Sequence, residues 1–227
     1  MAKVDEMKQQ EAAIGEAVSK TESFLENHSK AIVWGLVALF VVVGAVYGYR
    51  KLVVEPRFEK ASELMAEAQY RFEQATPDYE LALNGDENGA GFLDVIDQYG
   101  STPAGNLAKH YAGVCYLKSG DLDTAAEYLA KFSPVKGLPG EVVNAQNLGL
   151  QGDIAVDKGD YEAAVKFFAK AVKASDNIYT TPLYLRKQGL ALQALGRNAE
   201  AVELFEQILA DYPASMDARE AEKLIAE

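Results

Sequence analysis

The second half of the chain repeats a pattern of small residues at fixed spacing. When segments beginning at Leu107, Asn147 and Tyr184 are aligned, a glycine in each is followed seven positions later by a second glycine and twelve positions later by an alanine. Such recurrence indicates a repeat architecture, in which each unit is one supersecondary structure that stacks on the next. The three sets are Gly113, Gly120 and Ala125; Gly152, Gly159 and Ala164; and Gly189, Gly196 and Ala201.

Each position in the pattern has a steric explanation. The first glycine is expected where two antiparallel helices cross, because the missing side chain lets the backbones approach closely. The second glycine is expected to end the first helix in a left-handed conformation, with a short polar residue in the turn. The alanine faces the crossing from the second helix, and a bulky residue four positions later fills the space between repeats. The turn residues are Asp121, Asp160 and Asn198, the bulky residues are Leu129, Phe168 and Phe205, and Pro213 stops the last repeat.

This order of small residues, glycine turn, alanine, bulky residue and closing proline resembles the tetratricopeptide repeat (TPR) family over residues 107–213. The resemblance implies antiparallel helix pairs stacked into a solenoid that binds other proteins. The anchor glycines are 39 and 37 residues apart, whereas the family's repeat has about 34 residues. We therefore expect longer connections around residues 133–140 and 175–181.

The composition predicts an all-α fold. Alanine, leucine, glutamate and lysine dominate the last three quarters of the chain, and no alternating segment predicts a strand. We expect a polar, amphipathic N-terminal tail (1–29), a transmembrane helix (30–50) and a TPR solenoid (51–227) of about four helix pairs. Within the solenoid we expect a degenerate repeat at 56–102 with an insertion at 77–91, repeats at 107–135, 145–174 and 182–213, and a capping helix at 216–227.

The transmembrane prediction rests on residues 31–49, an uncharged stretch bounded by Lys30 and by Arg50. Nineteen helical residues at ~1.5 Å each match the ~30 Å hydrocarbon core of a bilayer. A cleaved signal peptide is the alternative, but it would begin with a short basic region, whereas thirty residues with six acidic side chains come first here. We therefore expect a retained anchor in the lipid bilayer. Gly44 and Gly48 would let two such helices approach, which leaves a homodimer open.

The orientation of this helix is predicted differently by two arguments. Lys20 and Lys30 precede it and four basic residues follow it closely, so the positive-inside rule favours a cytoplasmic repeat domain. The tail, single span and repeats together resemble the ancillary Sec translocon subunit (YfgM-like) family of bacteria. That resemblance implies an inner-membrane protein with a cytoplasmic N-terminus and periplasmic repeats that contact the translocon and periplasmic chaperones. We expect this second orientation, because the rule applies poorly to large translocated domains; the opposite orientation stays open.

The residue types do not favour catalysis, cofactors, metals or nucleic acid. After residue 55 the chain has sixteen basic and twenty-seven acidic residues, which would repel phosphate backbones. His28 and His110 are the only histidines and lie far apart in sequence, so a metal cluster or a histidine-based triad is not expected. The single cysteine, Cys115, is expected to be a small buried hydrophobe. The run from Gly85 to Gly89 lacks the acidic alternation of a calcium loop, and we interpret it as an ordinary loop.

The concave surface of a TPR solenoid, built from the first helix of each repeat, is the candidate partner-binding site. Its mixture of apolar and charged residues suggests extended or partly folded protein ligands. The alternatives are that several positions only pack against the neighbouring repeat, that the chain is a self-associating envelope scaffold, or that it faces the cytoplasm as a tethered adaptor. The candidate residues are Leu107, His110, Tyr111, Val114, Lys118, Asp153, Asp157, Leu183, Arg186, Lys187 and Leu190.

Overall fold

The computed structural model describes residues 2–226, apart from the side chains of residues 2–14, 16–18 and 23–25. The chain divides into two compact units, the second of which begins at Arg57. This boundary lies six residues beyond the start of the repeat domain expected at residue 51. The two units are described separately.

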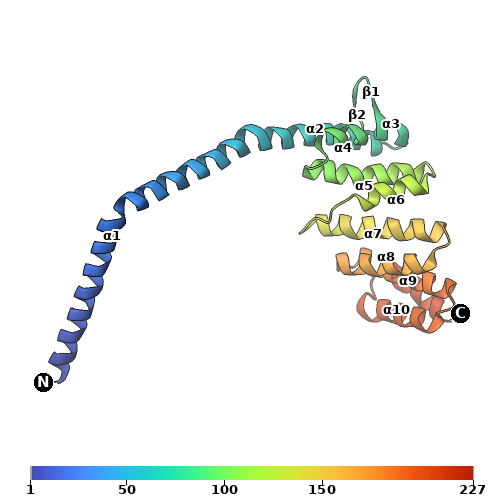
Figure 1. The fold of residues 1–227 in the computed structure, drawn as a ribbon. Coiled ribbons are helices and arrows are strands. Elements are labelled where there is room, and N and C mark those ends of the chain that lie inside the picture. The colour runs from blue at the N-terminus through green and yellow to red at the C-terminus, as the bar shows by residue number, and fades with distance from the viewer. Residues whose placement is uncertain (1, 227) are drawn as a thin grey trace. The chain divides into compact units, whose positions relative to one another are not determined.

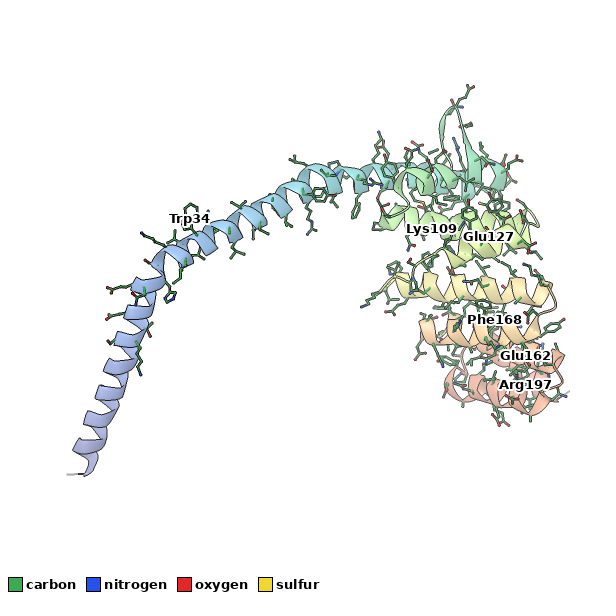
Figure 2. The ribbon with its side chains drawn as sticks, in the orientation of Figure 1. Trp34, Lys109, Glu127, Glu162, Phe168 and Arg197 are labelled. Carbon is green, nitrogen blue, oxygen red and sulfur yellow. The ribbon has the colours of Figure 1, made fainter. Side chains whose placement is uncertain are left out.

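The first unit is helical. Helix α1 (Ala2–Tyr49) contains both the tail and the apolar stretch, and a π-helical turn, η1 (Arg50–Val54), follows it. The side chains from Ile32 to Tyr47 are exposed, including Trp34 at 71% (Figure 2). One window here has a mean hydropathy of 2.3 with none of it buried, so by length and composition alone this segment could cross a membrane.

The second unit is a stack of antiparallel helix pairs (Figure 1). Its first helix, α2 (Glu55–Phe72), is followed by the insertion and by the rest of the stack. The all-α solenoid expected from the sequence is confirmed. The remaining helices are α3 (Tyr79–Asn84), α4 (Phe92–Tyr99), α5 (Pro103–Lys118), α6 (Leu122–Ala130), α7 (Gly140–Asp157), α8 (Tyr161–Ala174), α9 (Thr180–Ala194), α10 (Asn198–Asp211) and α11 (Met216–Ala226).

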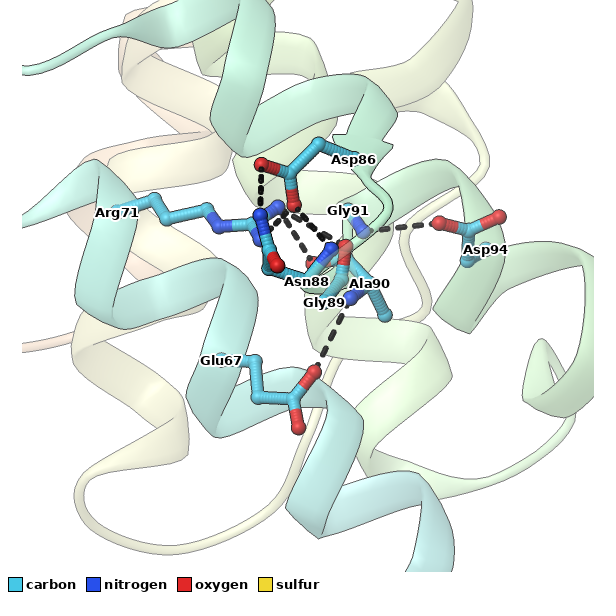
Figure 3. A network of polar contacts seen from close by, with 8 residues as sticks. All are labelled: Glu67, Arg71, Asp86, Asn88, Gly89, Ala90, Gly91 and Asp94. Carbon is cyan, nitrogen blue, oxygen red and sulfur yellow. Dashed lines mark hydrogen bonds and ion pairs between the residues drawn. The ribbon is translucent and has the colours of Figure 1, made fainter.

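The insertion holds a small strand pair that the sequence did not predict. Strands β1 (Gly85–Asp86) and β2 (Gly89–Ala90) form an antiparallel hairpin directly after α3. The expectation of a chain without strands is therefore wrong at this place, because a two-residue strand is too short to produce an alternating pattern. Figure 3 shows how the hairpin is held against α2 by Arg71, whose Nη2 lies 2.6 Å from Asp86 Oδ1, and by Glu67, whose Oε2 accepts a hydrogen bond of 3.0 Å from the Ala90 amide.

The anchor glycines lie where the helices of one pair cross. A Cβ placed on Gly113 would lie 2.6 Å from Leu129 Cγ, and Gly189 makes the equivalent close contact with the Phe205 ring. Leu129, Phe168 and Phe205 are each fully buried, and each packs both on the glycine of its own pair and in a core shared with the next element. The bulky side chain thus replaces the volume that the glycine leaves open.

The turns inside each pair follow one scheme with one exception. Gly120, Gly159 and Gly196 adopt φ values of 85°, 74° and 73°, the left-handed conformation that ends the first helix. Asp121 and Asp160 then cap α6 and α8 by accepting hydrogen bonds from Thr124 and Ala163. In the last repeat Arg197 occupies the capping position, and Asn198 is the first residue of α10 instead of the turn residue we expected.

Candidate partner-binding site

Helices α7 and α9 are the first helices of consecutive repeats, and an ion pair joins them. Lys187 Nζ lies 2.7 and 2.8 Å from the two carboxylate oxygens of Asp153, and the two side chains are 29% and 34% exposed. Both side chains are half-buried and keep part of their surface open to solvent, so the pair can present a donor and an acceptor to a ligand. Both residues were predicted for the site, and the structure brings them together.

A pocket of about 160 Å³ opens beside this ion pair. Its lining includes the Phe168 ring, which is only 1% exposed, and Leu190, which is 39% exposed. The ring centroid of Phe168 lies 5.9 Å from Lys187 Nζ, so a cation borders this apolar lining. A hollow with an apolar lining and a charged rim suits one apolar side chain whose backbone needs hydrogen-bond partners. The lining residues are Asp153, Val156, Tyr161, Phe168, Lys187, Leu190 and Ala191.

Two predicted residues of α9 lie outside this pocket. Arg186 Nε lies 2.6 Å from Asp217 Oδ1, which joins α9 to the capping helix α11. Leu183 is half-buried and packs against the core between α7, α8 and α9. These two side chains therefore contact neighbouring elements of the fold. This agrees with the alternative that some of the candidate positions only pack against the next element.

Two predicted residues of α5, Tyr111 and Leu107, pack against the degenerate first repeat. Tyr111 stacks on Phe92 with ring centroids 5.2 Å apart, and its ring meets Phe72 edge-on at 5.1 Å. Its hydroxyl accepts a hydrogen bond of 3.2 Å from Gln69 Nε2. Leu107 packs against the same core, while Val114 is half-buried and Lys118 is exposed at the end of α5. Asp157 is exposed at the corresponding end of α7.

His110 does not lie on an open surface, which corrects the prediction. Its side chain is 7% exposed, and its Nδ1 lies 3.2 Å from Asn147 Nδ2 in the seam between α5 and α7. Burial lowers the pKa of His110 to about 4, so the ring is neutral at neutral pH and Nδ1 accepts the hydrogen bond. The alignment placed His110 on the first-helix face but could not show that the next repeat covers it.

Two asparagines of α7 that were not predicted as site residues are buried here, one in the seam with α5 and one against the α6–α7 connection. Asn147 is 3% exposed and also accepts a hydrogen bond of 2.8 Å from Gln151. Asn144 pins the α6–α7 connection, because its Oδ1 accepts from the Val135 amide at 2.9 Å and its Nδ2 donates to the Val135 carbonyl at 2.7 Å. The sequence signal for such residues is a polar side chain at a position where the helical periodicity predicts an apolar one.

The network beside α2 is structural (Figure 3). Asp86 Oδ1 accepts a hydrogen bond from the Asn88 amide at 2.9 Å, and this bond is the main reason why the pKa of Asp86 is lowered. Asp94 Oδ2 accepts from the Gly91 amide and so starts α4. Among the side chains that the structure describes, no group of three or more histidine, cysteine or carboxylate residues is arranged to hold a metal ion.

Comparisons with known proteins identify the repeats. Residues 145–178 and 184–215 each match a family model described as tetratricopeptide repeat. These segments contain most of the α7–α8 pair and most of the α9–α10 pair, where the sequence predicted TPR units. The chain therefore carries tetratricopeptide repeats, which are protein–protein interaction modules. Comparison with curated proteins returned no match.

One solved structure of low sequence identity is similar in fold alone. A crystal structure of the MamA protein has a TM-score of 0.50 and 16% identity, and the match covers 74% of this chain and 80% of that one. A second crystal structure of MamA has a TM-score of 0.49 and 18% identity over 65% and 75% of the two chains. A putative kinesin light chain of Podospora anserina with TPR-like repeats has a TM-score of 0.49 and 14% identity over 76% and 83%.

Proposed function

We propose that this tetratricopeptide-repeat protein is a membrane-anchored adaptor that holds a segment of a partner protein on the surface formed by α7 and α9. The observation that carries the proposal is the pocket next to the Lys187–Asp153 pair. Solenoids generally use the concave surface of their first helices for such ligands.

The chemistry of the pocket defines the ligand. Its volume of about 160 Å³ accommodates a single apolar side chain and not a small-molecule cofactor. Lys187 and Asp153 at the rim supply a donor and an acceptor for the backbone of an extended segment. The ligand is therefore an unfolded or extended protein segment that carries an apolar anchor residue.

Residues 31–49 provide the membrane anchor in this proposal. The stretch is uncharged, long enough to cross the hydrocarbon core and bounded by Lys30 and Arg50, which favour the interface. A self-associating scaffold is the competing function, for which Gly44 and Gly48 would form the contact; a Cβ at either position would meet nothing within 4 Å.

The location we propose is the bacterial inner membrane, with the N-terminus in the cytoplasm and the repeats in the periplasm near the Sec translocon and its chaperones. The support is the resemblance of the chain's architecture to the ancillary translocon subunits. A periplasm-dependent reporter enzyme fused after residue 227 will be active in cells. Activity of only a cytoplasm-dependent reporter would reverse the orientation and leave the adaptor role intact.

Photo-crosslinking tests the binding surface. A photoreactive amino acid at Leu190 in the full-length membrane-bound chain will form adducts with other proteins, whereas the same group at exposed Lys166 of α8 will form at least about tenfold fewer. Equal adduct formation at both positions would contradict the proposed site. If the principal adduct at Leu190 is a second copy of this chain, the scaffold function replaces the adaptor.

A further inference from the structure

A second groove, of about 240 Å³, is lined by α6, the start of the α6–α7 connection, α7 and α8. Helix α7 packs against both α6 and α8 in the stack (Figure 1). Its contribution is three amide side chains, Asn144, Asn147 and Gln151, which lie on one face because they are three and four residues apart. Phe132 and Phe167 add aromatic lining, and we call the whole the amide groove. None of its lining residues belongs to the α7–α9 pocket.

The chain itself shows how an amide on this face of α7 binds a backbone. Asn144 Oδ1 accepts a hydrogen bond of 2.9 Å from the Val135 amide, and Asn144 Nδ2 donates one of 2.7 Å to the Val135 carbonyl. Val135 belongs to residues 132–136 of the α6–α7 connection, which are neither helix nor strand. One amide therefore pairs with both backbone groups of a residue in an irregular segment.

The next two amides keep hydrogen-bonding capacity for a ligand. Asn147 is 3% exposed; its Nδ2 lies 3.2 Å from His110 Nδ1, and its Oδ1 accepts a hydrogen bond of 2.8 Å from Gln151 Nε2. An amide side chain has two N–H groups and one carbonyl. Within the described part of the chain, the second N–H of Asn147 and the side-chain carbonyl of Gln151 have no partner. They can pair with a ligand backbone as Asn144 pairs with Val135.

Lys170 gives the amide groove its charge. Among the described side chains that line the groove, this lysine alone is charged. Its Nζ lies 5.4 Å from the Phe167 ring centroid, so the cation borders the aromatic lining. It forms no ion pair with any side chain that the structure describes. A carboxylate beside an apolar side chain would complement this arrangement.

The exposed surroundings of the groove are also basic, although the chain has a net charge of −12. Asp123 and Glu162 form ion pairs with Lys158 and Arg197. The remaining charges on α6, on α8, on the connections after these helices and in the first turn of α7 have a positive sum, which favours an anionic ligand over a cationic one. They are Lys131, Lys136, Lys166, Lys170, Lys173, Glu127, Glu141 and Asp176.

We infer that the amide groove binds an extended peptide segment in which an apolar residue stands next to a glutamate or an aspartate. The apolar side chain enters between Phe132 and Phe167. The peptide backbone pairs with Asn147 and Gln151, and the carboxylate pairs with Lys170. The inference rests neither on the membrane anchor nor on the α7–α9 pocket, so it adds a second binding face to the solenoid.

Fluorescence anisotropy of labelled peptides tests the inference, with the full-length chain in detergent micelles. One probe is a short glycine–serine peptide with a central phenylalanine between two glutamates, and the other has lysines in place of the glutamates. The glutamate peptide will bind about fivefold more tightly, because its carboxylates attract Lys170 whereas the ammonium groups of the other peptide repel it. Equal affinities, tighter binding of the lysine peptide or no binding of either would overturn the inference.

Matched variants locate the site. Lys170→Glu will remove the preference for the glutamate peptide, while Lys166→Glu, exposed on the same helix and outside the lining of the groove, will keep it. Gln151→Leu will weaken the binding of both peptides about fivefold through the lost hydrogen bond, while Gln146→Leu, at an exposed position of α7, will not. Lys170 is itself exposed, so its variant tests the site even if Gln151→Leu lowers the melting temperature.

A variant of the α7–α9 pocket separates the two sites. Leu190→Glu places a charge in the lining of that pocket and will leave the affinity for the glutamate peptide within about twofold. Loss of binding in this variant, together with no effect of Lys170→Glu, would place the peptide in the α7–α9 pocket. That result would overturn the inference and support the proposed function.

Discussion

The ring of Phe168 lies directly over Gly152: a Cβ placed on the glycine would come within 2.5 Å of Cε1 and 2.7 Å of Cδ1. Both residues are buried, and the ring also stacks on Tyr184 of the next repeat with centroids 6.4 Å apart. Any side chain at position 152 would therefore displace a ring that two repeats share.

Gly152→Leu will destabilise the repeat domain by about 1–3 kcal/mol, because the added atoms overpack the crossing of α7 and α8. The measurement is the melting temperature followed by circular dichroism. Gln146→Leu is the matched control, since it adds the same side chain at an exposed position of α7. Equal melting temperatures for the two variants would show that the crossing is misassigned.

Gly159→Ala will lower the free energy of unfolding by about 1–2 kcal/mol, for a different reason. A Cβ there would meet nothing within 4 Å, so the cost comes entirely from the left-handed backbone at φ 74°. Gly159→Asn will cost less, because asparagine tolerates this conformation better than alanine. Chemical denaturation of the two variants gives the comparison, and a larger loss for the asparagine variant would rule out backbone strain as the cause.

The repeat register could be predicted because its constraints are local. Gly113 and Leu129 belong to one hairpin, and the spacing between such residues appears directly in the sequence. The turn of the last repeat was predicted one residue too far along, because Asn198 is a better capping residue than Arg197, which holds the position.

The binding site was less predictable because it depends on contacts between repeats. Asp153 and Lys187 are 34 residues apart, and their pairing follows from how α7 and α9 stack. The stacking of α5 and α7 likewise covers His110 with Asn147, and these two residues are 37 residues apart. The helical register predicts the face of the helix on which a residue lies. It does not predict which residues of the next repeat lie against that face.

Acid will destabilise the seam between α5 and α7 through His110. Its pKa is about 4 in the folded chain and about 6.5 when unfolded, so the folded state binds fewer protons between these values. The stabilising contribution is complete above pH 6.5 and is lost progressively as the pH falls toward 4, by on the order of 3 kcal/mol.

Because carboxylates also titrate in this range, the quantity to measure is the difference between the pH profiles of the unsubstituted chain and His110→Gln. The glutamine can keep a hydrogen bond to Asn147 but does not titrate. The difference between the two unfolding free energies will change between pH 6.5 and 4 and be constant above pH 7. A constant difference throughout would show that His110 is accessible to water.

A further prediction concerns Asn144, whose side-chain amide forms two hydrogen bonds with the backbone of Val135, nine residues earlier in the chain. Asn144→Ala leaves the amide and the carbonyl of Val135 without this partner, which will cost about 1–3 kcal/mol. The Val135 amide will exchange its hydrogen faster, while amides within α8 will not change at neutral pH. Gln146→Ala, at an exposed position of the same helix, controls for the loss of a polar side chain.

Asn144→Asp separates the two hydrogen bonds. A carboxylate still accepts from the Val135 amide but cannot donate to the Val135 carbonyl, so amide protection will survive in part while stability falls. Hydrogen exchange read residue by residue gives both quantities. Full protection of Val135 in the alanine variant would mean that the α6–α7 connection is held by other contacts.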